Sequence, residues 1–314
     1  MKKTSLVLLS SSLIIASLVF SINMANYRAM PSAYAQTNAA MIASLVTSNN
    51  NNDNAIINNA MVSSDITNSS TAATAVTSNT TEGLEIKKGV NYFDGASGYL
   101  VYPSVASSNK KLPGVIMIHE NRGLNDNIMN MANTLAREGY AVLAVDLFKG
   151  QVAQTSQQAQ QLASSARSNP EVTISNLQAA VNYVSSLPFV DSSKLAVIGW
   201  CFGGGQALQL ALHSESHPLA ATILYYGTPL VTDKQELSKI KWPVLGIFGD
   251  KDQAIPLPNI QQFKAALDAD GIPNEIHIYK GLGHAFANPS GANYAPKETV
   301  DAWQKTLEFL KKYT

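Results

Sequence analysis

Cysteine is nearly absent from this sequence, and several other signals are missing as well. One cysteine in 314 residues excludes an intrachain disulfide, and none lies near the N-terminus, which excludes acylation of a lipobox cysteine there. Lys and Arg number 22, as do Asp and Glu, so no charge excess points to nucleic acid. The glycines at 203–205 lack the Lys-Ser/Thr of a P-loop and the spacing of a dinucleotide fingerprint. We therefore expect no nucleic-acid partner, no nucleotide and no other cofactor.

The first 35 residues have the pattern of an export signal. Lys2 and Lys3 precede an uncharged apolar run over residues 6–22, and residues 33–35 (Ala-Tyr-Ala) offer a cleavage site. The run has 17 residues, close to the shortest membrane span, and the cleavage site lies far beyond it, so an uncleaved anchor is the alternative. In both cases we expect an exported protein, either secreted or associated with the membrane through residues 6–22.

Residues 36–82 are dominated by Asn, Ser, Thr and Ala. Such a segment cannot bury enough apolar surface to offset the entropy lost on ordering, so it predicts a disordered linker. Asn68 and Asn79 begin glycosylation sequons, which also arise by chance in a tract of this composition. We expect the folded domain to occupy residues 83–314 and to be monomeric.

From residue 83 onward, apolar runs alternate with helical patterns. The continuous apolar character of several runs indicates strands covered on both faces. Asn169-Pro170 predicts an N-cap and a proline at the first helical position, and apolar residues recur at helical spacing between 300 and 310. This order predicts an α/β fold with a doubly wound, mostly parallel sheet and right-handed crossovers. The expected strands are residues 98–102, 115–119, 141–146, 195–198, 221–226, 244–248 and 275–279.

The only cysteine lies in the motif Gly-Trp-Cys-Phe-Gly at 199–203, between an expected strand and a helix expected over residues 204–213. This context is typical of the nucleophile elbow of α/β-hydrolases, with G-x-C-x-G in place of G-x-S-x-G. The glycines allow a sharp turn, and the helix start supplies free N–H groups and a positive dipole end, so a thiol held there ionises more easily. A lone cysteine is otherwise more often a buried structural residue. The motif favours Cys201 as a nucleophile.

Two further strand ends carry partners for this thiol. Asp252 follows the strand that ends at Phe248, and His284 lies in a glycine-rich loop after the last strand. The order Cys201, Asp252, His284 is the order nucleophile, acid, histidine, in which the imidazole takes the thiol proton and the carboxylate fixes its tautomer. Asp250 competes for the acid role, and the alternative for His284 is an ordinary loop histidine.

The strand expected to end at His119 leads into Glu120, Asn121 and Arg122. In this position we expect the N–H groups of Asn121 and Phe202 to form an oxyanion hole. From the residues alone, Glu120 is either a solvated loop acid or a group that orients the thiolate. Arg122 pairs either an acidic substrate or a neighbouring carboxylate. No second histidine stands at the HExxH spacing, so no metal is expected.

Together these motifs make the chain similar to the dienelactone hydrolase (carboxymethylenebutenolidase) family. The resemblance covers residues 83–314 and implies a Cys-Asp-His triad at Cys201, Asp252 and His284 that opens lactones or esters through an acyl-enzyme. It also implies that Glu120 interacts with the cysteine and assists its activation. The resemblance rests on GYLVYP (98–103), PGVIMIHENRG (113–123), EGYAVLAVDL (138–147), IGWCFGG (198–204), Tyr226-Gly227, residues 249–256 and GHAF (283–286).

The substrate contacts depart from the family pattern. Members that act on dienelactone carry an arginine four residues after the catalytic histidine, where this chain has Asn288, and another before the elbow, where the Gln-rich region 151–168 offers only Arg167. An asparagine cannot replace a bidentate carboxylate clamp. We therefore expect a neutral or differently shaped ester or lactone, contacted by Arg122, Trp200 and Asn288.

The sequence thus predicts a cofactor-independent hydrolase that acts on a small-molecule ester or lactone. One alternative is an exported thiol carboxylesterase or acyltransferase that acts on neutral esters. The other is a non-catalytic exported binding module, which would have no reason to retain the triad and both elbow glycines.

Overall fold

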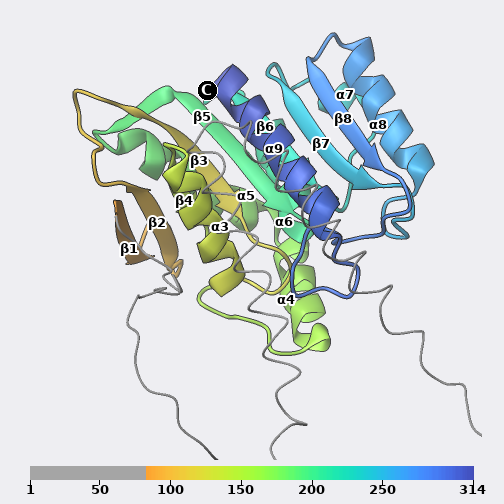
Figure 1. Cartoon of the computed structure of the whole chain (residues 1–314), viewed down its shortest axis with the longest axis horizontal. Coiled ribbons are helices and arrows are strands. Elements are labelled where there is room, and N and C mark those ends of the chain that lie inside the picture. Colours follow the sequence, from red (N-terminus) through yellow and green to blue (C-terminus); the bar gives the residue numbers. More distant parts are fainter. Residues whose placement is uncertain (1–82) are drawn as a thin grey trace, which may run out of the picture. The chain divides into compact units, whose positions relative to one another are not determined.

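The computed structural model describes residues 83–314, which form an eight-stranded sheet in the order β1-β2-β4-β3-β5-β6-β7-β8 (Figure 1). β1, β2 and β4 pair antiparallel in turn, and the other neighbours are parallel. The predicted α/β fold is therefore confirmed. The strands are β1 (Leu84–Val90), β2 (Gly98–Pro103), β3 (Leu112–Ile118), β4 (Ala141–Ala144), β5 (Val190–Trp200), β6 (Ala221–Tyr225), β7 (Val244–Gly249) and β8 (Asn274–Tyr279). The predicted signal (1–35) and linker (36–82) lie outside the described residues.

Helices cover both faces of this sheet. α3 packs on β2 and β4, and α9 packs on β6 and β7; both cross the near face in Figure 1. α5 and α6 pack on β3 and β5. Burial on both faces explains the continuous apolar runs, since every residue of β4 has no exposed surface. The helices are α3 (Asp126–Arg137), α4 (Ser156–Ser168), α5 (Pro170–Ser186), α6 (Phe202–Leu212), α7 (Lys234–Leu237), α8 (Leu257–Ala269) and α9 (Pro296–Tyr313).

The structure departs from the sequence-based expectations at several boundaries. β1 was not expected, because this antiparallel edge strand is mostly exposed and carries little apolar periodicity. Helix α6 begins at Phe202, two residues earlier than expected, directly after the cysteine. α5 begins at Pro170 as predicted, but Asn169 does not cap it through its side chain, which donates to the Ser165 carbonyl instead.

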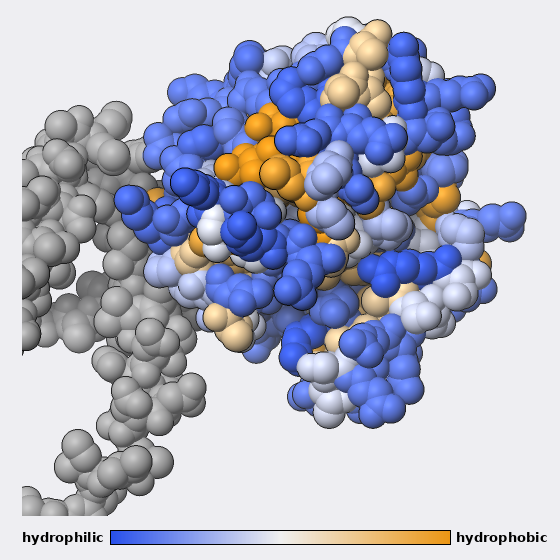
Figure 2. Space-filling view, turned by 90° about the vertical axis from the view of Figure 1, so that its right-hand side faces the viewer, coloured by the Kyte–Doolittle hydropathy of each residue, from blue (hydrophilic) through white to orange (hydrophobic). Residues whose placement is uncertain are grey.

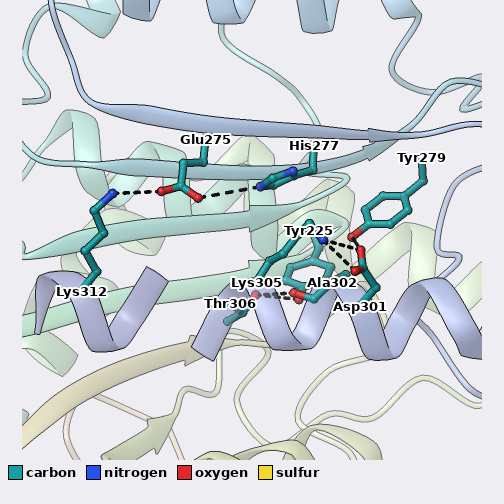
Figure 3. A network of polar contacts seen from close by, with 9 residues as sticks. All are labelled: Tyr225, Glu275, His277, Tyr279, Asp301, Ala302, Lys305, Thr306 and Lys312. Atoms are coloured by element: carbon teal, nitrogen blue, oxygen red, sulfur yellow. Dashed lines mark hydrogen bonds and ion pairs between the residues drawn. The ribbon is translucent and has the colours of Figure 1, made fainter. Parts of the chain in front are cut away.

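Polar contacts tie α9 to β8 and to β6 (Figure 3). The Tyr279 hydroxyl donates to Asp301 at 2.6 Å, and Lys312 donates to Glu275 at 3.3 Å. The Tyr225 hydroxyl and Thr306 share a buried hydrogen bond of 2.7 Å. An exposed ion pair such as Lys312–Glu275 contributes little stability by itself. The contact at Tyr279 lies at the end of β8, from which the loop with His284 departs.

Among residues 83–314, β8 is one of the two edge strands of the sheet, and β1 is the other. Ile278 of this strand is 40% exposed, and hydrophobic residues gather on part of the largely hydrophilic side of the domain that Figure 2 shows. An open edge strand can pair with another chain, so the expected monomeric state stays a prediction. Within residues 83–314, no helix is long and apolar enough to span a bilayer.

Candidate active site

Cys201 occupies a strained turn between β5 and α6. Its φ of 53° and ψ of −117° cost a residue with a Cβ on the order of 1–3 kcal/mol. Two glycines make the turn possible. A Cβ on Gly199 would lie 2.2 Å from the Gly203 carbonyl oxygen, and one on Gly203 would lie 2.4 Å from the His119 carbonyl oxygen. The turn leaves the thiol half-buried at the carboxyl edge of the sheet, which is the geometry of a nucleophile elbow.

The structure brings Cys201, His284 and Asp252 together in one hydrogen-bonded chain. His284 Nε2 lies 3.1 Å from Cys201 Sγ, and His284 Nδ1 lies 2.7 Å from Asp252 Oδ2. Burial lowers the pKa of His284, but the hydrogen bonds to Asp252 and Cys201 outweigh it and raise this pKa to about 10. The imidazole therefore favours its protonated form while it contacts the sulfur.

The two aspartates that compete for the acid role make different contacts. Asp252 is buried, and its second oxygen, Oδ1, accepts from the N–H groups of Ala254 and Ile255 at 2.8 and 3.1 Å. Asp250 instead accepts from the Gly281 N–H at 2.6 Å and ties two loops together. The Asp252 side chain therefore faces the imidazole, whereas Asp250 holds the loop that leads to it.

Glu120 is a second buried acid at this edge of the sheet. It is 8% exposed, and Asn288 Nδ2 donates to its Oε2 at 2.5 Å. Burial raises the pKa of Glu120 to about 7, although His284, Asn288, Tyr226 and Arg122 each oppose the shift. Glu120 is thus a carboxyl group that changes charge near neutral pH beside the histidine.

The residues predicted for the oxyanion hole and for substrate binding differ in how accessible their polar groups and surfaces are. In the described part of the chain, no hydrogen bond uses the backbone N–H of Phe202 or Asn121. Arg122 is half-buried and close enough to Glu120 to lower its pKa. Trp200 is only 2% exposed and packs on Tyr225 with ring centroids 5.3 Å apart, so it presents no surface to a substrate.

Sequence reasoning overlooked His119, which supports the site without facing it. The Leu147 N–H donates to its Nε2 at 3.2 Å, so its Nδ1 carries the proton and donates to the Glu120 carbonyl at 2.6 Å. Complete burial lowers the pKa of His119 and keeps the ring neutral. His119 thereby joins the ends of β3 and β4. The sequence signal that could have identified His119 is a histidine directly after a wholly apolar strand.

An apolar wall lies on the α4 side of the cysteine. A buried hydrophobic cluster that contains Phe202 packs against Cys201. The same cluster is contacted by half-buried Leu147, Leu162 and Ala166. Arg167 lies over the Phe202 ring, 5.4 Å from its centroid, and donates to the Thr228 carbonyl at 3.3 Å. Over residues 83–314, no three His, Cys, Asp or Glu side chains are grouped to hold a metal ion.

The chain is similar in sequence and fold to known proteins. The model of the dienelactone hydrolase family matches residues 97–314. A relative from Saccharolobus solfataricus, to which carboxymethylenebutenolidase activity is attributed, is 32% identical over 65% of this chain and 90% of its own length. A similarly described relative from Methylorubrum extorquens is 28% identical over 68% of this chain and 76% of its own. A Klebsiella pneumoniae crystal structure described as a dienelactone hydrolase is 25% identical, covers 73% of this chain and 99% of its own, and has a TM-score of 0.63.

Proposed function

Because the chain belongs to the dienelactone hydrolase family and is a carboxylic ester hydrolase, we propose that Cys201 is the nucleophile that opens its small-molecule ester or lactone substrate. The observation that carries this proposal is the chain from Cys201 Sγ to His284 at 3.1 Å and on to Asp252 at 2.7 Å. A thiol, an imidazole within reach of its proton and a carboxylate on the other ring nitrogen are the parts that acyl transfer requires.

In the first half of the reaction, the Cys201 sulfur attacks the carbonyl carbon and the carbonyl π electrons move to the oxygen. The N–H groups of Phe202 and Asn121 bind this oxyanion, since neither has a hydrogen-bond partner within residues 83–314. When the tetrahedral intermediate collapses, the C–O bond to the leaving group breaks and His284 Nε2 supplies the proton to the leaving alkoxide. The products are a thioester on Cys201 and an alcohol, which stays attached when the substrate is a lactone.

In the second half, a water molecule attacks the thioester carbonyl while His284 takes its proton. The C–S bond breaks, the thiolate is regenerated, and the acid leaves. Asp252 stabilises the imidazolium in both halves and keeps the Nδ1 proton on its own side of the ring, since Oδ1 is held by two backbone N–H groups.

Replacing the thiol tests this assignment. Cys201→Ala should lower kcat/KM for ester hydrolysis by at least about 10³-fold, because the acyl-enzyme can no longer form. Thermal unfolding of the variant and circular dichroism control for folding. Full esterase activity in a folded Cys201→Ala protein would refute the proposal.

The preferred substrate in this proposal is a neutral ester or lactone. Asn288 is engaged by Glu120, and Arg167 by Phe202 and Thr228, so neither is poised to clamp a substrate carboxylate. The apolar wall at Leu147, Leu162 and Ala166 suits an uncharged acyl group. A screen of neutral and carboxylate-bearing lactones and short-chain esters tests this, and a preference for the charged lactones would contradict it.

We also propose that the protein acts outside the cytoplasm, on the strength of the N-terminal pattern at residues 1–35. The N-terminal sequence and mass of the mature protein, recovered from cell fractions, would test this. Cleavage after Ala35 supports a secreted form, and an intact N-terminus in the membrane fraction supports an anchor. An intact chain in the cytosol would contradict export.

A further inference from the structure

We propose that Asn288 is a positioning residue: its side-chain amide holds the Glu120 carboxylate beside the His284–Cys201 pair and sets the pH at which that pair becomes fully reactive. This role replaces the substrate contact expected from the sequence. The proposal rests on the proposed function for its consequence in catalysis, although its first test reads the thiol directly.

The orientation of the Asn288 amide is fixed by its neighbours. The Ser290 N–H and hydroxyl both contact Asn288 Oδ1, at 2.9 and 2.8 Å. A backbone N–H can only donate, so the atom that faces Ser290 is the carbonyl oxygen. The amide nitrogen must then face Glu120 and donate to it. Asn288 is therefore a dedicated donor to this carboxylate.

The same loop carries the histidine. Backbone hydrogen bonds from Asn288 N–H to the Ala285 carbonyl and from Gly291 N–H to the Asn288 carbonyl, each 3.0 Å, form two consecutive turns after His284. Asn293 Nδ2 donates to the His284 carbonyl at 3.0 Å. Glu120 comes from a different segment, the loop after β3. The contact between Asn288 and Glu120 thus joins the β3 end of the site to the loop that holds the imidazole.

The charge of Glu120 affects the neighbouring His284–Cys201 pair. Glu120 faces His284, Tyr226 from the end of β6, and Arg122 from its own loop. Ionised Glu120 and protonated His284 stabilise each other, and this coupling is reciprocal. Hydrogen bonding from Asn288 favours the ionised carboxylate as well. The His284–Cys201 pair should therefore gain reactivity as Glu120 ionises, with an inflection near pH 7.

A series at position 288 tests the proposal through the rate of iodoacetamide alkylation from pH 5 to 9, which reads Cys201 alone because it is the only cysteine. Asn288→Ala removes the donor and should move the inflection upward by about one pH unit, which lowers the rate at pH 7 about fivefold and leaves the rate at pH 9 unchanged. Asn288→Asp places a second carboxylate beside Glu120 and should move the inflection further upward. Asn288→Arg restores a donor that also carries positive charge, and it should move the inflection below the wild-type value.

Ser290→Ala serves as the matched control. It removes one hydroxyl contact to Asn288 Oδ1 and leaves the backbone N–H bond and the contact to Glu120 in place, so its profile should match the wild type. Equal rate losses at every pH in the three Asn288 variants, or no ordering of their inflections, would overturn the positioning role. Failure of the proposed function is a separate outcome, since it would appear as hydrolysis by Cys201→Ala with the alkylation series still ordered.

Discussion

Two buried carboxylates flank the imidazole of His284, and their surroundings differ. Asp252 accepts two backbone N–H bonds through one oxygen and faces His284 with the other. Glu120 has one amide donor, from Asn288, and burial raises its pKa to about 7. These similar side chains therefore differ in what they do: Asp252 accepts a hydrogen bond at the imidazole, and Glu120 changes charge near pH 7.

This comparison shows what sets the behaviour of a buried acid. Two backbone N–H donors hold the Asp252 carboxylate in place. At Glu120, the Asn288 amide and the charges of His284 and Arg122 do not offset the loss of water. The same isosteric change, carboxylate to amide, can therefore be made on both sides of His284, and the two results should differ in size and in pH dependence.

The largest effect is expected on the Asp252 side. In Asp252→Asn the backbone N–H groups retain the amide oxygen, which turns the NH₂ group toward His284 Nδ1 and forces the wrong tautomer. We expect kcat to fall by about 10³-fold or more, with a smaller change in KM. Steady-state kinetics on the best ester measures this, and a loss below tenfold would show that Asp252 does not orient the imidazole.

On the other side, Glu120→Gln should change rate modestly and remove a pH dependence. The amide keeps a hydrogen bond with Asn288 but cannot ionise, so the inflection near pH 7 in kcat/KM should disappear, with a rate change of about tenfold or less at pH 8. A wild-type inflection that persists in this variant would mean that another group titrates there.

Glu120 should also make stability depend on pH. Its folded pKa of about 7 lies above the ordinary value of 4.5, so between these values the folded state binds more protons than the unfolded state. Its contribution therefore lowers the free energy of unfolding as pH rises through this window. The free energy of unfolding of Glu120→Gln, relative to that of the wild type, should rise by about 2–3 kcal/mol from pH 5 to pH 8. Urea denaturation at the two pH values measures this gain, and equal differences at both would contradict it.

The smallest effect is expected at Asp250, the matched control for Asp252. Asp250→Asn retains an oxygen that can accept from the Gly281 N–H, and it does not touch His284. We expect kcat/KM within about threefold of wild type, since the loop tie persists as a neutral hydrogen bond. A loss as large as that of Asp252→Asn would erase the distinction between the two aspartates.

Much of the fold could be predicted, because a strand covered on both faces has a strong apolar signal. β3, β4 and β6 are of this kind, and their positions were predicted. β1 was missed because pairing with β2, rather than burial, makes it a strand. The side-chain cap at Asn169 was predicted wrongly, since α4 ends at the same residue and draws the amide toward its own last turn.

The site was predictable where spacing determines the geometry. Cys201, Asp252 and His284 follow strands that end at one edge of a parallel sheet, so chain order sufficed to predict that they meet. The contact between Asn288 and Glu120 joins residues 168 positions apart and has no local signal. For His119 and Trp200, burial decides what the side chain can touch, and neither motif nor spacing reports it.

In the proposed reaction, the ester passes through a thioester on Cys201. The most direct measurement is mass spectrometry of the protein quenched in acid during turnover of a slow ester, followed by peptide mapping. We expect a mass increase equal to the acyl group on the peptide that contains Cys201, a larger acylated fraction in variants that deacylate slowly, and no adduct in Cys201→Ala. An acyl group on another residue, or hydrolysis by the Cys201→Ala protein at the wild-type rate, would contradict it.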